Sequence, residues 1–195
     1  MSGIAAKSLG LTWGSWHGGS VPVLERQTAL VKLLDDLIKR RISFLTSYQN
    51  KAYATSYQNF VEQVRAAEAK LSPQGPYKLT EAVARYLFKL MAYKDEYEVA
   101  RLHSNGQFKA KIAGMFEGDY AIKYHLAPPL LYKHDAQGHL IKREFGSWIG
   151  KVFPVLASLR FLRGSLLDPF GYTAERKSER ALIQQYKKQL LSLLP

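Results

Sequence analysis

The chain has 195 residues, no cysteine, and a formal net charge of +12 from 28 lysines and arginines against 16 acidic residues. A chain of this length folds as one domain, or as one domain with an ordered extension. The absence of cysteine excludes disulfides, a cysteine nucleophile and a cysteine-ligated iron–sulfur cluster within these residues.

The positive charge is spread along the sequence, and the most compact basic run is Lys39–Arg41. A nucleic-acid-binding module usually concentrates its cations on one face and combines them with a recognisable motif or with stacking aromatic residues. Because no such motif is found, the charge favours a solvated surface or a docking face for an acidic protein. A basic nucleic-acid-binding or general protein-interaction module is kept as the alternative.

Residues 1–21 are predicted to be the frayed end of a preceding domain or a linker, and residues 22–195 a helical domain. Trp13 and Trp16 lie among glycines, a combination that indicates a contact with another domain. No apolar run is long enough to span a bilayer, and residues 1–19 lack the pattern of a secretory signal. We therefore expect a cytoplasmic protein that does not interact with membranes.

Residues 23–71 are predicted to form one very long helix, or two helices with a break near Asn50. The helix starts after Pro22, because proline is tolerated at the first helical position, and it ends at the turn-forming cluster 72–76. Within it, the string TSYQN at 46–50 recurs nine residues later. Nine residues make about two and a half helical turns, so the two copies are predicted to face opposite ways.

Residues 79–102 are predicted to form a second helix, with Thr80 as its N-cap and its end at Asn105 and Gly106 in the usual left-handed style. Apolar residues at spacings of three and four define one face of this helix. Charged residues continue the same face: Lys94, Asp95, Glu98 and Arg101. Charges on such a stripe are costly unless they are paired or turned toward a partner.

A short helix is predicted around residues 108–115. Alternating residues at 120–124 and 139–145 then predict a small β-hairpin or extended excursion. A third helical segment is predicted at residues 148–162, with a kink or interruption at Pro154 and an end at Gly164.

The sequence 168–171 predicts a turn, after which Thr173 caps a C-terminal helix. The inner stripe of that helix is predicted to contain Ile183, Tyr186, Leu190 and Leu193. The fold class is therefore predicted to be mainly α, with long helices and one small β-hairpin or extended excursion.

No catalytic or metal site is predicted. His134 and His139 flank a turn, but two loop histidines fall short of the three or four convergent ligands that a metal needs. The carboxylates near residues 95–98 and 117–119 lack a visible pocket, and pairing of Glu98 with Lys94 and Arg101 along the helix explains the first group. The sequence contains no nucleophile elbow, phosphate-binding loop or dinucleotide fingerprint.

The string LTEAVARYLFKLMAYKDEYEVARL at residues 79–102 closely resembles a signature in the C-terminal domain of indolepyruvate ferredoxin oxidoreductase. Further blocks similar to that domain follow in the same order: FEGDY at 116–120, HLAPPLL at 125–131, REFGSW at 143–148, LRG at 162–164 and FGYTAER at 170–176. The resemblance covers about residues 37–186.

The resemblance implies an enzyme that oxidatively decarboxylates aryl pyruvates to acyl-CoA thioesters and passes the electrons to ferredoxin. It also implies thiamine diphosphate and iron–sulfur clusters, which belong to other domains of that family. This chain has neither the cluster cysteines nor a thiamine-diphosphate motif. We therefore expect no cofactor on this chain and a structural or docking role without an active site of its own.

The expected partners are the catalytic domains or subunits of the oxidoreductase, with acidic ferredoxin or the phosphates of CoA as a second possibility for the basic surface. The charged stripe and the charged residues of the similar blocks form the candidate structural or docking network. Its members are Lys94, Asp95, Glu98, Arg101, Glu117, Asp119, His125, Arg163 and Arg176.

Overall fold

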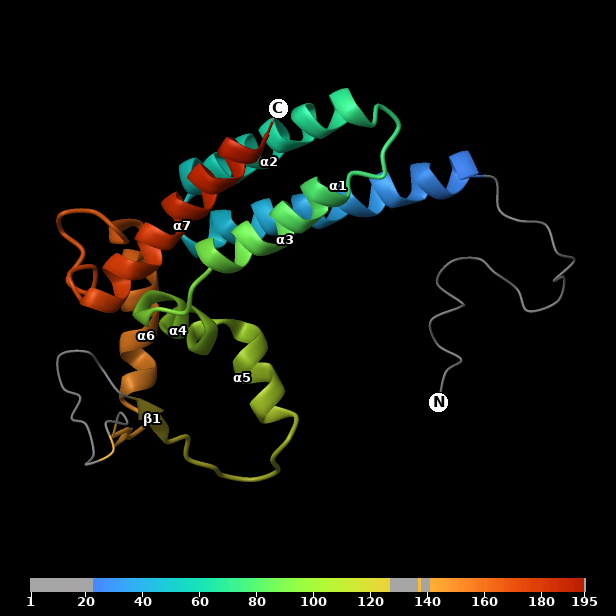
Figure 1. Ribbon diagram of the computed structural model, residues 1–195. Coiled ribbons are helices and arrows are strands. Elements are labelled where there is room, and N and C mark those ends of the chain that lie inside the picture. Colours follow the sequence, from blue (N-terminus) through green and yellow to red (C-terminus); the bar gives the residue numbers. More distant parts are fainter. Residues whose placement is uncertain (1–22, 127–136, 138–140, 195) are drawn as a thin grey trace, which may run out of the picture.

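The computed structural model describes residues 23–126, 137 and 141–194 (Figure 1). Helices dominate this part of the chain, and one two-stranded sheet accompanies them, which confirms the prediction of a mainly α fold with a small hairpin. The expected terminal segment 1–21 and the histidines at 134 and 139 lie outside the described residues.

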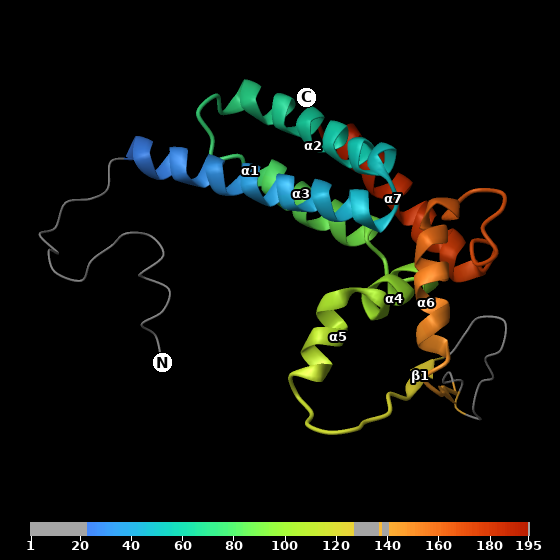
Figure 2. The same cartoon turned by 180° about the vertical axis from the view of Figure 1, so that it is seen from behind.

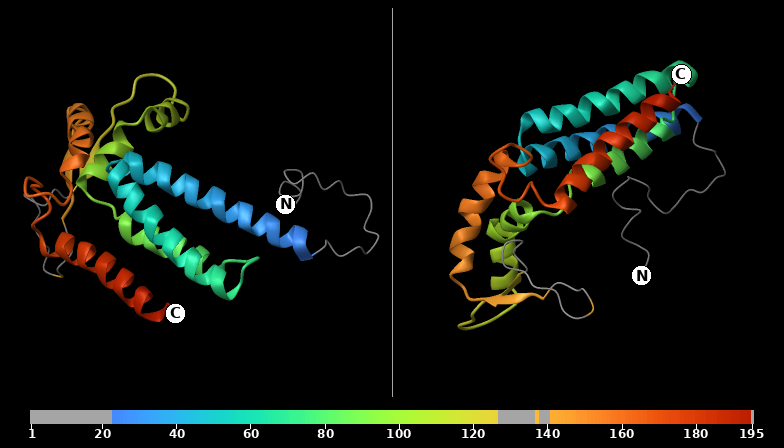
Figure 3. Two further views of the ribbon diagram at one scale, coloured as in Figure 1. Left: turned by 90° about the horizontal axis from the view of Figure 1, so that it is seen from above. Right: turned by 60° about the vertical axis from the view of Figure 1, so that its left-hand side comes forward.

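Four helices pack side by side as a bundle. They are α1 (Val23–Tyr48), α2 (Lys51–Leu71), α3 (Lys78–Met91) and α7 (Ala174–Leu193). Seen from behind, α1 and α2 form a hairpin across the bundle (Figure 2), and α7 runs back along α3 (Figure 3). A smaller lobe at one end of the bundle contains α4, α5, α6 and the hairpin.

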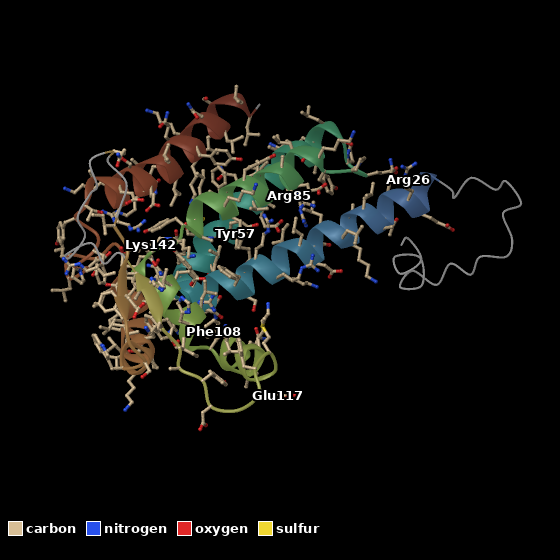
Figure 4. The ribbon with its side chains drawn as sticks, turned by 90° about the horizontal axis from the view of Figure 1, so that it is seen from below. Arg26, Tyr57, Arg85, Phe108, Glu117 and Lys142 are labelled. Atoms are coloured by element: carbon tan, nitrogen blue, oxygen red, sulfur yellow. The ribbon has the colours of Figure 1, made fainter. Side chains whose placement is uncertain are left out.

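Of the two alternatives for residues 23–71, the structure has two helices. Asn50 begins the second of them, because its side chain accepts a hydrogen bond from the backbone of Tyr53, as N-cap residues do. The chain reverses there, so the two TSYQN copies do not face opposite ways as predicted. Tyr48 and Tyr57 are both fully buried in the bundle core, and Figure 4 shows Tyr57 between the helices.

The predicted single helix over residues 79–102 is wrong. It is divided into α3 and α4 (Glu96–Ser104), because Asp95 caps a new helix by accepting a hydrogen bond from the backbone of Glu98. Thr80 is not the cap of α3. It lies inside the helix, where its backbone and hydroxyl both donate to Glu68 of α2.

The left-handed stop predicted at Asn105 and Gly106 is also wrong. Asn105 has an extended backbone and caps α5 (Gly106–Ala113) through its side chain. Its side chain can accept the backbone N–H of Phe108, which satisfies a donor at the start of α5 that would otherwise have no partner. The short helix therefore begins two residues before the predicted position.

The hairpin pairs β1 (Tyr124–Leu126) with β2 (Arg143–Phe145) in antiparallel register, with His125 opposite Glu144. Helix α6 (Ile149–Ser158) follows, contains Pro154, and tightens into the 3₁₀ helix η2 (Leu159–Leu162). Gly164 then adopts a left-handed φ of 74°, which ends the segment as predicted.

Thr173 caps α7 as predicted. Ile183, Tyr186 and Leu190 of its predicted inner stripe pack against the bundle core, but Leu193 is largely exposed. Leu194, which follows the last residue of the helix, packs against the core in its place.

Two apolar cores follow from this arrangement. The larger lies among α1, α2, α3 and α7, and the smaller joins α4 and α6 with Tyr124 of the hairpin. None of the described helices is long and apolar enough to cross a membrane. The charged residues singled out from the sequence lie mainly where the two cores meet.

Candidate functional site

Arg163 occupies the junction between the bundle and the smaller lobe. Its guanidinium donates to both carboxylate oxygens of Asp95, at 2.5 and 2.8 Å, and its Nη1 donates to the backbone oxygen of Tyr48 at 2.5 Å. The guanidinium carbon lies 3.6 Å from the centre of the Tyr48 ring. Arg163 and Asp95 side chains are each 3% exposed. This arrangement satisfies a buried ion pair, which would otherwise be strongly destabilising.

Asp168 closes the loop that follows Arg163. Its carboxylate accepts from the Tyr97 hydroxyl at 3.1 Å, from the Gly164 backbone at 2.7 Å and from the Phe170 backbone at 3.1 Å. The sequence placed Asp168 only in a turn. Three donors held by one buried carboxylate instead connect the loop to α4.

A second ionic group lies beside the first. Arg176 at the start of α7 pairs with Glu179 at 2.5 Å and with Glu96 of α4 at 3.5 Å, and it lies over the ring of Tyr93. Burial raises the pKa of the Glu96 carboxyl, although the hydrogen bond from its own backbone and the charge of Arg176 oppose the shift. Its Oε2 is buried and has no hydrogen-bond partner.

The third pair is Glu98 with Arg101, joined by two hydrogen bonds of 2.7 and 2.8 Å within α4. Arg101 also lies over the ring of Phe44 in α1. The predicted pairing of Lys94 with Glu98 is wrong, because Lys94 precedes the helix and is not one helical turn away from Glu98. Among the described residues no carboxylate pairs with Lys94.

Three residues of the predicted network lie away from the junction. Glu117 and Asp119 are exposed on the segment after α5 and form no ion pair with another described residue, and Figure 4 shows Glu117 at the edge of the molecule. His125 is on the exposed hairpin, 3.9 Å from Glu144, which pairs more closely with Lys123. The structure therefore gathers Asp95, Glu98, Arg101, Arg163 and Arg176. Lys94 adjoins Asp95 at the same place, whereas Glu117, Asp119 and His125 are separate from this group.

A pocket of about 260 Å³ opens between α4 and α6 beside the junction. We call it the α4–α6 pocket. Its charged lining consists of Lys94, Asp95, Glu96 and Arg176. Its apolar walls come from α4, β1, α6 and the turn before α7: Val99, Leu126, Ile149, Val152, Phe153, Leu156 and Phe170. Largely apolar walls with a few polar groups are typical of binding pockets.

The outer face of α6 adds to this pocket an exposed apolar stripe, which we call the α6 stripe. It consists of Trp148, Val152, Val155 and Leu159, which are 58%, 41%, 62% and 37% exposed. Their spacing of four, three and four residues places them along one face of the helix. The sequence analysis predicted this helix but did not single out the face, although the same spacing rule would have found it.

Residues 34–195 match the model of a family of unknown function (DUF6537). The chain belongs to this family. No curated protein and no solved structure matches the chain.

The matched part of this DUF6537 chain contains all the junction residues, the α4–α6 pocket and the α6 stripe. Among the described residues, no group of three histidine or carboxylate side chains is placed to hold a metal ion. The buried carboxylates of Asp95 and Glu98 are held by arginines. The arrangement can therefore fix the angle between the bundle and the smaller lobe, and it presents an apolar surface beside a charged pocket.

Proposed function

We propose that this chain is a non-catalytic docking domain of a 2-oxoacid ferredoxin oxidoreductase of the indolepyruvate type. The proposal combines the ordered sequence blocks that resemble the C-terminal domain of that enzyme with the exposed α6 stripe. In this proposal the catalytic domains carry the thiamine diphosphate and the iron–sulfur clusters, act in the cytoplasm, and cover the stripe. This chain holds them together without touching the reacting atoms.

The α6 stripe is the observation that carries the proposal. Four large apolar side chains along one helix face are more than isolated exposed residues, and such patches mark interaction surfaces. Covering the exposed half of one such side chain would stabilise the complex with the partner by about 1 kcal/mol. The adjoining α4–α6 pocket offers a place for one apolar side chain of the partner.

The ionic junction supports the same role through rigidity. Arg163 connects α4, through Asp95, to the end of α1, through the Tyr48 carbonyl. A docking surface that is held in one geometry loses less conformational freedom on binding, so more of the contact energy contributes to affinity. The buried Arg163 guanidinium, hydrogen-bonded at each of its nitrogens, suits this positioning role better than acid–base chemistry, which needs a free group beside a substrate.

The test is co-expression of this chain with tagged catalytic domains of such an oxidoreductase, followed by size-exclusion chromatography. We expect one complex containing both, and we expect Val155→Asp to weaken it roughly 100-fold, because a charge would be buried in an apolar contact. Leu33→Asp is the matched control, since Leu33 is also 62% exposed but lies on α1 in the bundle. Separate elution of the wild-type chain, or equal loss with both variants, would refute the proposal.

A further inference from the structure

A second cavity, also lined by Arg163, lies between α2, the end of α3 and α7. Its volume is about 210 Å³, and we call it the cationic cavity. It is lined by Gln49, Tyr53, Ser56, Met91, Tyr93, Arg163, Gly164, Arg180, Ile183, Gln184 and Lys187. Three of these residues carry a positive charge and none carries a negative charge.

The three cations differ in how they are compensated. Arg163 is neutralised by Asp95. In the part of the chain that the structure describes, neither Arg180 nor Lys187 has a carboxylate within ion-pair distance. The cavity therefore has an excess of about two positive charges at neutral pH, since arginine and lysine are protonated there.

The two uncompensated side chains are also partly removed from water. Arg180 donates from Nη2 to the Gly171 carbonyl at 2.6 Å, but its Nη1 is buried with no hydrogen-bond partner. Lys187 donates to the Ser56 hydroxyl at 3.2 Å and lies over the ring of Phe60. Burial lowers the pKa of the Lys187 amine. A buried donor without a partner and a half-buried cation without an anion are both costly.

We propose that the cationic cavity binds a phosphate group, either as inorganic phosphate or as the phosphate of a monoester. A phosphate dianion balances the charges of Arg180 and Lys187 together, whereas one carboxylate balances only one of them. It also accepts several charge-assisted hydrogen bonds, from Arg180 Nη1 and from the remaining protons of Lys187. The Ser56 hydroxyl supplies a neutral partner at the same wall.

The cavity is larger than a phosphate ion, and it adjoins an outer groove that contains the same Ser56 and Lys187. This groove, of about 730 Å³, is lined mainly by polar residues of α2, including Lys51, Thr55, Asn59 and Gln63. A monoester can therefore place its phosphate in the cavity while its alcohol portion lies in the groove. Free phosphate would fill the inner part together with water.

The first test is isothermal titration calorimetry of the purified chain with inorganic phosphate and, separately, with glycerol phosphate, at constant ionic strength. Arg180→Gln and Lys187→Gln should each weaken phosphate binding at least tenfold, because each removes one charge-assisted contact. Lys188→Gln is the matched control, since Lys188 is the exposed neighbour of Lys187. Equal phosphate affinity in all four proteins, or none in the wild type, would overturn the proposal.

Two comparisons complete the test. Acetate at the same ionic strength should bind at least tenfold more weakly than phosphate, and equal affinity would refute the charge matching. Tighter binding of glycerol phosphate than of inorganic phosphate would assign the groove to a monoester, and equal binding would assign the site to free phosphate. The Lys187 amine, followed by NMR, should show a higher pKa with saturating phosphate, and an unchanged pKa would contradict the contact even where a variant folds poorly.

Discussion

Replacement of Arg163 by alanine should be the most damaging single change at the junction. The substitution removes both hydrogen bonds to Asp95, the hydrogen bond to the Tyr48 carbonyl and the contact with the Tyr48 ring. It leaves the Asp95 carboxylate, 3% exposed, without a counter-charge. Breaking a buried pair in this way costs about 3–5 kcal/mol, a large part of the stability of a single domain.

The assay is urea unfolding followed by circular dichroism, with Arg85→Ala as the matched control. Arg85 also binds its glutamate, Glu81, through two hydrogen bonds of 2.7 and 2.9 Å, but both side chains are about half exposed. An exposed pair one helical turn apart contributes only about 0.3–0.5 kcal/mol. If Arg163→Ala lost no more free energy of unfolding than Arg85→Ala, the junction would not be the structural centre that we describe.

A second pair of predictions concerns a close approach and a buried acid. A Cβ at position 171 would lie 2.6 Å from Asp168 Oδ2, so Gly171→Ala should lower the free energy of unfolding by about 1–3 kcal/mol. The control Gly106→Ala, with no atom within 4 Å of its Cβ, should change that free energy by less than about 0.5 kcal/mol. Equal effects of the two substitutions in urea unfolding would contradict the packing. The raised pKa of Glu96 means that the folded state holds this proton more tightly than the unfolded state. Its contribution is therefore most favourable below the unfolded pKa, which is 4.5, and is lost as the pH rises through the folded pKa. Glu96→Gln should thus gain stability relative to the wild type as the pH rises above 4.5, measured by unfolding at constant ionic strength, and a difference that is flat or falls with pH would rule this out.

The helices were predictable where local chemistry decided them. Two helices begin at residues whose side chains cap them, α2 at Asn50 and α7 at Thr173. The segment formed by α6 and η2 ends at Gly164, which has a positive φ that glycine adopts easily. The division between α3 and α4 was missed because no glycine or proline marks it, and because the charged residues after it keep the helical spacing of the apolar face before it. A local signal existed: Asp95 followed three residues later by Glu98 is the pattern of a capping box.

The candidate site was less accessible to sequence reasoning, because its contacts are long-range. Arg163 and Asp95 are 68 residues apart, and helical periodicity carries no information on such a pair. The charged stripe did indicate that ions would meet the core. The structure compensates its two carboxylates with Arg163, directly after η2, and with Arg101 of α4 itself. Arg180 and Lys187 escaped notice because an unpaired cation on an amphipathic helix resembles a solvated one until the neighbouring helix is in place.

The most direct test of the docking role is backbone amide hydrogen exchange of this chain, alone and with saturating catalytic domains of the oxidoreductase. Amides that a partner covers exchange more slowly. We expect slower exchange across α6, which carries the exposed stripe, and unchanged exchange in the first half of α1. Unchanged exchange across α6 in the presence of the catalytic domains would contradict the proposal.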